Sequence, residues 1–124
     1  MTPRRLNVAL VLVALGLLCP VEKAWPQIVF GNIVGTVTDT SGGAVPDAKI
    51  TVTNVGQGVS FNALSNSSGN YEQTHLIPGT YSVKVEKQGF QTYVQENIAV
   101  AADTTTQVNV VLKIGAVTQV VTVT

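Results

Sequence analysis

The sequence predicts an all-β fold, an antiparallel β-sandwich of about seven or eight strands. Three observations predict it. From Gly31 onward, Val, Thr, Ile and Tyr dominate, and these residues favour the pleated surface of a strand. Short segments alternate apolar and polar side chains, which gives each strand one apolar face. Gly, Pro and Asn turn signals separate the segments at intervals of about eight to twelve residues, and no segment has the apolar period of a helix.

The strands of the first half are predicted over residues 32–39, 48–54, 59–64 and 70–76. A Gly-rich turn at 41–43 separates the first two, a second turn at 56–58 follows, and a polar loop at 65–69 precedes the fourth. Alternation places one set of side chains of the first two strands in the core. These are Ile33, Gly35 and Val37, then Ala48, Ile50 and Val52.

The second half begins with the strongest strand pattern, over residues 80–87, after the turn formed by Pro78 and Gly79. A short extended segment around Phe90 and Tyr93 and a brief edge segment at 98–100 follow. The last long strand is predicted over 104–113, and residues 117–124 are again β-prone. The inward residues of the two long strands are Tyr81, Val83 and Val85, then Val108, Val110 and Leu112. We therefore expect a sandwich domain over residues 27–114 and a β-prone tail over 115–124.

Residues 1–26 have the pattern of a signal peptide. Arg4 and Arg5 form a positive start, and an apolar run over residues 6–18 follows. The run is shorter than the roughly 20 residues of a membrane-spanning helix, which favours a signal peptide over an uncleaved anchor. Cys19 is the single cysteine, so the sequence excludes a disulfide framework.

The charge of residues 27–124 excludes an electrostatic site for nucleic acid. Removing residues 1–26 takes away three of the 7 basic and one of the 7 acidic side chains. The remaining 4 basic and 6 acidic side chains give a net charge of 4 − 6 = −2. The remaining lysines form no cluster. We expect a mildly acidic exported domain.

The side chains that carry catalytic chemistry are scarce, and we expect no catalytic residue, no cofactor and no metal. His75 is the single histidine, and a zinc site needs three or four converging ligands. A hydrolytic triad needs a base beside its nucleophile, and the strand neighbours of His75 point to the other face. Asp39 and Asp47 flank the first turn, where they either cap the turn or contribute to a calcium site.

Exposed aromatic side chains are the feature that sugar-binding surfaces share. Tyr93 is the best exposed candidate and Phe61 the second, whereas Tyr71 and Tyr81 are expected to fill the core with their hydroxyls at its margin. An exposed pair formed by Phe61 and Tyr93 favours carbohydrate binding, and burial of both removes the main support for it.

Two motifs resemble those of the carboxypeptidase regulatory-like domain and cover most of residues 32–113. The first is Gly35-x-Val37-x-Asp39-x-x-Gly42-Gly43-Ala44-x-Pro46-x-Ala48-x-Ile50. The second is Gly69-x-Tyr71-x4-Leu76-x-Pro78-Gly79-x-Tyr81-x-Val83-x-Val85-x3-Gly89-Phe90. The resemblance implies a transthyretin-like (prealbumin-like) antiparallel sandwich. It also implies an accessory role without zinc ligands or catalytic residues, since the family takes its name from a domain beside the catalytic domain of some metallocarboxypeptidases.

The order of signal peptide, sandwich and residues 115–124 resembles the N-terminus of large TonB-dependent, Oar-like outer-membrane receptors. That resemblance implies a periplasmic or outer-membrane location. We expect a non-catalytic structural or protein-interaction module whose sheet edge or C-terminal strand receives a protein partner, with contacts at Val117 and Val121. The alternative is a carbohydrate-binding module with a starch-binding-like sandwich and contacts at Phe61 and Tyr93. Fold alone does not decide between them.

Overall fold

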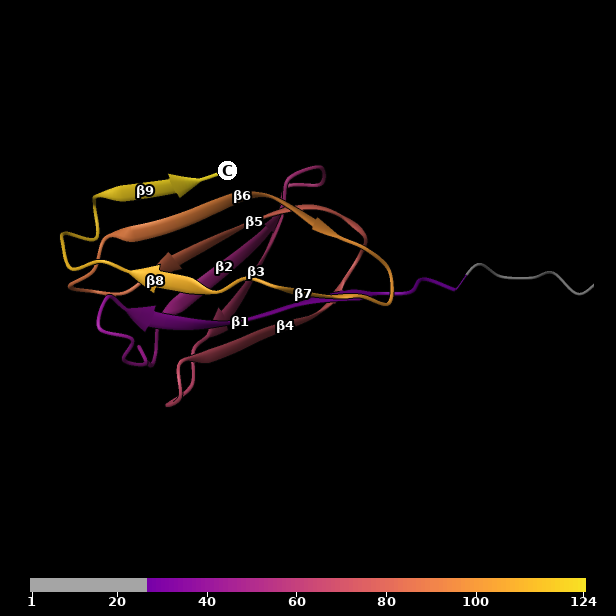
Figure 1. The fold of residues 1–124 in the computed structure, drawn as a ribbon. Helices are drawn as coiled ribbons and strands as arrows, with labels where there is room; N and C mark the ends of the chain where they lie inside the picture. Colours follow the sequence, from indigo (N-terminus) through magenta and orange to yellow (C-terminus); the bar gives the residue numbers. More distant parts are fainter. Residues whose placement is uncertain (1–26) are drawn as a thin grey trace, which may run out of the picture.

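The computed structural model describes residues 27–124, which form strands and turns (Figure 1). The predicted signal peptide, residues 1–26, lies outside the described residues. Within residues 27–124 there is no helix long and apolar enough to span a membrane. The strands in chain order are β1 (Gly31–Asp39), β2 (Lys49–Asn54), β3 (Val59–Leu64), β4 (Asn70–Leu76), β5 (Gly79–Glu86), β6 (Thr92–Val100), β7 (Thr105–Gln107), β8 (Val110–Leu112) and β9 (Val120–Val123).

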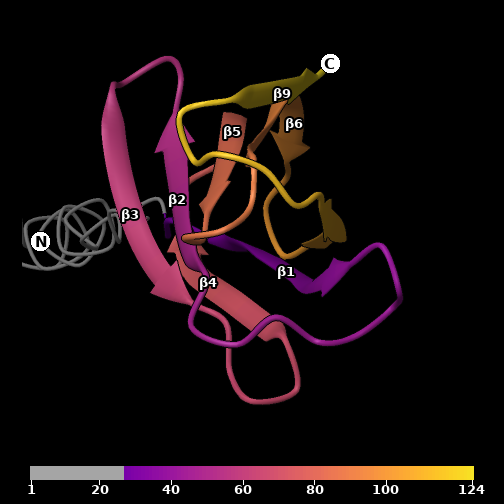
Figure 2. The same ribbon diagram turned by 90° about the vertical axis from the view of Figure 1, so that its left-hand side faces the viewer.

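The strands form the two layers of a sandwich, which Figures 1 and 2 show from two sides. The smaller sheet has the order β4-β1-β7, and β8 pairs with the C-terminal part of β1, after the part that pairs with β7. The larger sheet has the order β3-β2-β5-β6-β9. The predicted β-sandwich is therefore confirmed. The prediction of a wholly antiparallel fold is wrong, because β7 and β8 run parallel to β1 and β9 runs parallel to β6.

The core lies between the two sheets and contains the side chains that the alternation places inward, together with residues such as Val45 that lie outside the strands. β1 alternates buried and half-buried residues along its length, as expected for a strand with one face on the core. Tyr71 and Tyr81 are buried, and their hydroxyls donate to the carbonyls of Val108 (2.5 Å) and Ile77 (2.7 Å). The buried apolar residues are Ile33, Val37, Val45, Ala48, Ile50, Val52, Tyr71, Leu76, Tyr81, Val83, Val85, Ile98, Val100, Val108, Val110 and Leu112.

Two strands differ from the sequence-based expectation. The short segments expected around Phe90 to Tyr93 and at 98–100 belong largely to one strand, β6, which has a register shift opposite β5. The long strand expected over 104–113 is divided into β7 and β8. At the division, the Asn109 side-chain oxygen accepts a hydrogen bond from the Thr36 amide (3.2 Å), so a side chain takes the place of a backbone carbonyl beside β1.

The polar loop at 65–69 contains a buried residue that the sequence does not reveal. Ser65 is 2% exposed. Its hydroxyl donates to the Val45 carbonyl (2.7 Å) and accepts from the Ala48 amide (2.8 Å). It therefore joins the end of β3 to the chain that enters β2.

Candidate protein-interaction edge

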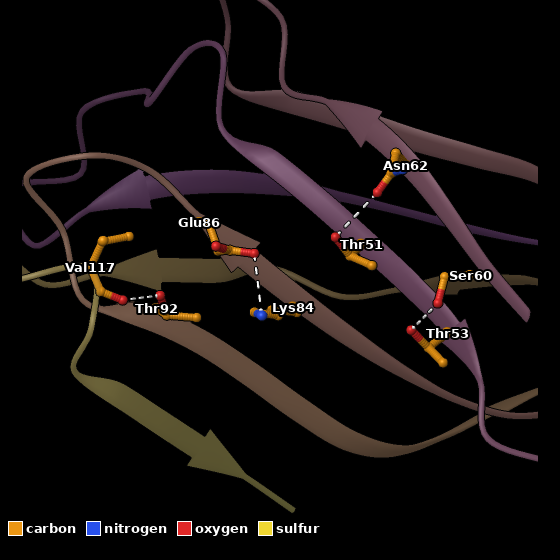
Figure 3. A network of polar contacts seen from close by, with 8 residues as sticks. All are labelled: Thr51, Thr53, Ser60, Asn62, Lys84, Glu86, Thr92 and Val117. Carbon is orange, nitrogen blue, oxygen red and sulfur yellow. Dashed lines mark hydrogen bonds and ion pairs between the residues drawn. The ribbon is translucent and has the colours of Figure 1, made fainter. Parts of the chain in front are cut away.

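The last strand, β9, forms one edge of the five-stranded sheet, where Figure 1 shows it alongside β6. Thr92 of β6 holds the turn that leads into it. The Thr92 hydroxyl donates to the Val117 carbonyl (2.6 Å), as Figure 3 shows. The Thr92 amide donates to the Gln119 carbonyl (2.8 Å). Thr92 itself is 2% exposed, and its two bonds hold the turn that sets the register of β9.

The register determines which backbone groups of β9 face away from the sheet. Thr92 lies opposite Val120, and Val94 lies opposite Thr122. In a parallel ladder, a residue bonds to the two neighbours of its opposite residue, so residues 119, 121 and 123 direct their backbone groups to β6. The backbone amides and carbonyls of Val120 and Thr122 therefore face outward, and no strand within residues 27–124 pairs with them.

The side chains of this edge are uncharged. The sequence has no ionisable side chain from Ile114 to Thr124. Val120 is 58% exposed and Val123 is 41% exposed. Soluble proteins usually protect an edge strand with charges, proline or a covering segment, and β9 has none of these among residues 27–124.

Beside the edge lies an apolar groove of about 170 Å³ between the two sheets. Tyr93 and Val121, two of the residues singled out from the sequence, lie opposite each other on β6 and β9 and both line it. The Tyr93 hydroxyl donates to Gln95 Oε1 (2.9 Å), and burial raises the pKa of the Tyr93 phenol. Val123 and Val111 complete the apolar wall, and Lys113 stands at its rim. These three residues were not predicted from the sequence. For Val123 the available signal was the alternation of β9, which places it on the same face as Val121.

The other predicted contact residues are separated from this groove. Val117 is 40% exposed and contributes its carbonyl to Thr92. Phe61 lies on β3, the opposite edge of the sheet, facing the core beside Val52. Phe61 and Tyr93 are both half-buried and pack against the core, so they do not form an exposed aromatic pair. The expectation that Tyr93 is well exposed is wrong, because its position opposite Val85 turns it inward.

The outer face of the five-stranded sheet is polar. Thr51 bonds to Asn62 (3.3 Å), Thr53 bonds to Ser60 (2.9 Å), and Lys84 pairs with Glu86 (3.4 Å) (Figure 3). These pairs are solvent-exposed and contribute little to stability. The exposed apolar side chains of this sheet therefore lie at its edges, with Val120 and Val123 on β9 and Val59 and Leu64 on β3.

The remaining titratable candidates do not converge. The Asp39 carboxylate accepts hydrogen bonds from the Ser41 hydroxyl and from the amides of Ser41 (2.9 Å) and Gly43 (3.0 Å). These bonds hold the pKa of Asp39 below its ordinary value, which is the behaviour of a turn cap. His75 is exposed, and its ring contacts Phe30. Among residues 27–124, no three His, Cys, Asp or Glu side chains gather as metal ligands would.

Solved structures with a similar fold come from proteins of several kinds. A candidate carbohydrate-binding protein of Bacteroides uniformis superposes with a TM-score of 0.55 at 18% identity over 66% of this chain. The major pilin subunit BcpA of Bacillus cereus superposes with a TM-score of 0.55 at 11% identity over 70% of this chain. Hydroxyquinol 1,2-dioxygenase of Pseudomonas putida superposes with a TM-score of 0.57 at 10% identity over 74% of this chain. This chain spans 40%, 31% and 59% of those three chains, respectively. At such identities the likeness shows the fold alone.

Sequence comparison identifies the family. Curated proteins include no significant match to this chain. Residues 32–113, which run from β1 to just beyond β8, match the carboxypeptidase regulatory-like domain. They contain both motifs noted in the sequence and nearly all of the core. The chain therefore belongs to the carboxypeptidase regulatory-like domain family.

Proposed function

We propose that this chain is a non-catalytic protein-interaction module and that a strand of a partner protein adds to its five-stranded sheet along β9. The observation that carries the proposal is the open, uncharged edge of β9, with outward backbone groups at Val120 and Thr122. Strand addition satisfies such groups, and neighbouring side-chain pockets supply specificity. The groove lined by Tyr93 and Val121 is the pocket next to this edge.

The groove indicates the chemistry of the partner strand. Its walls are mainly apolar, so the partner places alternate apolar side chains against the core side of the sheet. Thr122 on the outer face is compatible with hydroxyl or amide residues at the intervening positions. Lys113 at the rim favours an acidic residue at one end of the partner strand.

The proposal includes export to the periplasm or the outer-membrane surface and a relationship to the N-terminal domain of TonB-dependent receptors. The positive start and apolar run of residues 1–26 support export. Mass spectrometry of the chain recovered from cell fractions tests this part. Recovery from the cytoplasmic fraction with residues 1–26 intact contradicts it.

A non-catalytic role agrees with the family, whose name refers to a peptidase but whose domain lies beside the catalytic one. The dioxygenase with a similar sandwich shares only the fold, at 10% identity. The carbohydrate alternative that rests on Phe61 and Tyr93 loses its support, because both side chains pack against the core.

Site-specific photocrosslinking in cells tests the edge. A benzoylphenylalanine at Val120 should give a covalent adduct with another polypeptide, whereas the same residue at Thr51, on the outer face of the sheet, should not. Thr122→Pro removes an outward amide and should abolish the adduct, because proline cannot donate to an added strand. Thr122→Val is the matched control, since it keeps the amide and should keep the adduct.

Thermal unfolding of the two Thr122 variants establishes that both fold. Equal crosslinking at Val120 and Thr51, or an adduct that persists in the folded Thr122→Pro variant, refutes strand addition at β9.

A further inference from the structure

The outer face of the smaller sheet differs in chemistry from that of the larger one. Its strands, β1, β4, β7 and β8, contain no lysine or arginine, whereas Lys49 and Lys84 belong to β2 and β5 of the larger sheet. The smaller sheet instead presents amide, hydroxyl and carboxylate groups. This face lies on the opposite side of the sandwich from the outer face of the larger sheet, as Figure 2 shows.

A depression of about 480 Å³ lies over this sheet. Five polar side chains line it around the apolar Val34 and Leu64, and its volume is within the range of about 300–1,000 Å³ typical of small-molecule sites. The strand register makes them neighbours, since Val34 lies opposite both Glu72 and Gln107, and Thr36 lies opposite Asn70. The polar lining consists of Thr36, Asn66, Asn70, Glu72 and Gln107.

Internal hydrogen bonds fix part of this lining and leave the rest available. Asn109 Oδ1 accepts from the Thr36 hydroxyl (3.2 Å) and from Gln107 Nε2 (3.4 Å), which leaves the Gln107 carbonyl oxygen as an acceptor. Asn66 Oδ1 accepts from the Ser68 (3.0 Å) and Asn70 (2.9 Å) amides, which leaves the Asn66 amide group as a donor. Among residues 27–124, the Glu72 carboxylate forms no ion pair.

An exposed aromatic pair stands beyond the depression, where β1 begins. Phe30 is 40% exposed, and its ring lies edge-on to His75 with the centroids 5.5 Å apart. His75 is exposed and has a φ of 59°. This left-handed conformation interrupts the alternation of inward and outward side chains in β4. Phe30 directly precedes β1, and at the rise of a strand it lies about 20 Å from Thr36. The pair and the depression therefore lie along the neighbouring strands β1 and β4.

We propose that this face binds a neutral polysaccharide, which packs a sugar ring on Phe30 and His75 and forms hydrogen bonds in the depression. Sugar hydroxyls both donate and accept, and the side chains of Asn66, Gln107 and Glu72 offer both kinds of group. The absence of lysine and arginine from these strands, together with the Glu72 carboxylate, disfavours an anionic polymer. An aromatic surface packs against the apolar C–H face of a sugar while its edge stays in water.

Affinity electrophoresis of the full chain tests the proposal. Gels contain a soluble neutral polysaccharide (hydroxyethyl cellulose, arabinoxylan, galactomannan or starch) or the anionic polymer alginate. At least one neutral polymer should retard the chain, and alginate should not. Phe30→Ala and Glu72→Gln should each weaken retardation by about tenfold, as loss of one aromatic contact or one charged hydrogen bond predicts.

Matched controls on the other sheet separate a site from general adhesion. Thr51→Ala and Lys84→Ala change exposed outer-face residues of β2 and β5 and should leave retardation unchanged. Thermal unfolding confirms that each variant folds. Retardation by alginate alone, by none of the polymers, or to the same extent in both sets of variants overturns the proposal. The photocrosslinking at β9 is a separate readout. A failure of one proposal is therefore distinguishable from a failure of the other.

Discussion

Ser65→Ala tests whether one buried hydroxyl holds the entry to β2. The alanine keeps the backbone bonds of residue 65, from its amide to the Ala48 carbonyl (3.1 Å) and from the Asp47 amide to its carbonyl (2.9 Å). It removes the partner of the Val45 carbonyl and of the Ala48 amide, in residues that are 4% and 0% exposed. A buried polar group left without a partner costs about 1–3 kcal/mol, so the pair predicts a loss of about 3 kcal/mol.

Thermal and urea unfolding of the full chain, followed by circular dichroism, measure this loss. For a domain of this size, about 1 kcal/mol corresponds to about 4–8 °C, so the Tm should fall by about 12–24 °C. Ser67→Ala is the matched control, because Ser67 is exposed in the same loop and should change stability by less than about 0.5 kcal/mol. A Ser65→Ala variant that loses less than about 1 kcal/mol refutes the reasoning, since water or a local shift would then satisfy both groups.

Three further changes have calculable effects. Gly35→Ala should prevent stable folding, because the added Cβ would lie 1.8 Å from the Val108 carbonyl oxygen; an unchanged urea midpoint contradicts that close approach. Tyr81→Phe should cost about 2 kcal/mol, since the hydroxyl donates to Ile77 and accepts from the buried Asn54 amide (3.2 Å), and unfolding as in wild type would be evidence against this bond pair. Asp39 has a lowered folded pKa, so its turn contribution is present above its unfolded pKa of about 3.9 and is lost as the pH falls through the folded value. Asp39→Asn should therefore flatten the acid limb of stability against pH, and parallel curves for the two proteins would exclude this role.

The sequence predicts the strands that bury one regular face. It predicts less well which strands pair with each other and in which direction. The alternation at Ile50 and Val52, and at Val83 and Val85, is regular because these strands are central and antiparallel, and their inward residues are all fully buried. Alternation does not encode the direction of the neighbouring strand. The parallel pairing of β9 with β6 therefore could not be read from residues 117–124, although their β character could.

The candidate sites were predictable only in part, because their geometry depends on tertiary structure. Tyr93 and Val121 were selected as separate contacts, and their proximity follows from a strand register that only tertiary structure fixes. The inward turn of Tyr93 depends on the register shift between β5 and β6, which the sequence does not mark. Phe30 directly precedes β1 and His75 lies on β4, so their ring contact depends on strand pairing, and the positive φ of His75 is not marked in the sequence.

β1 completes its pairing with residues near the other end of the chain. Thr36 and Asn109, which bond to each other beside β1, are 73 residues apart in sequence. During synthesis, one side of β1 stays open until the residues of β7 and β8 have left the ribosome. A long loop must close before that contact forms, which slows folding and prolongs exposure of the apolar face. The export that we propose requires an unfolded polypeptide, and a topology that delays closure of the sandwich is compatible with that requirement.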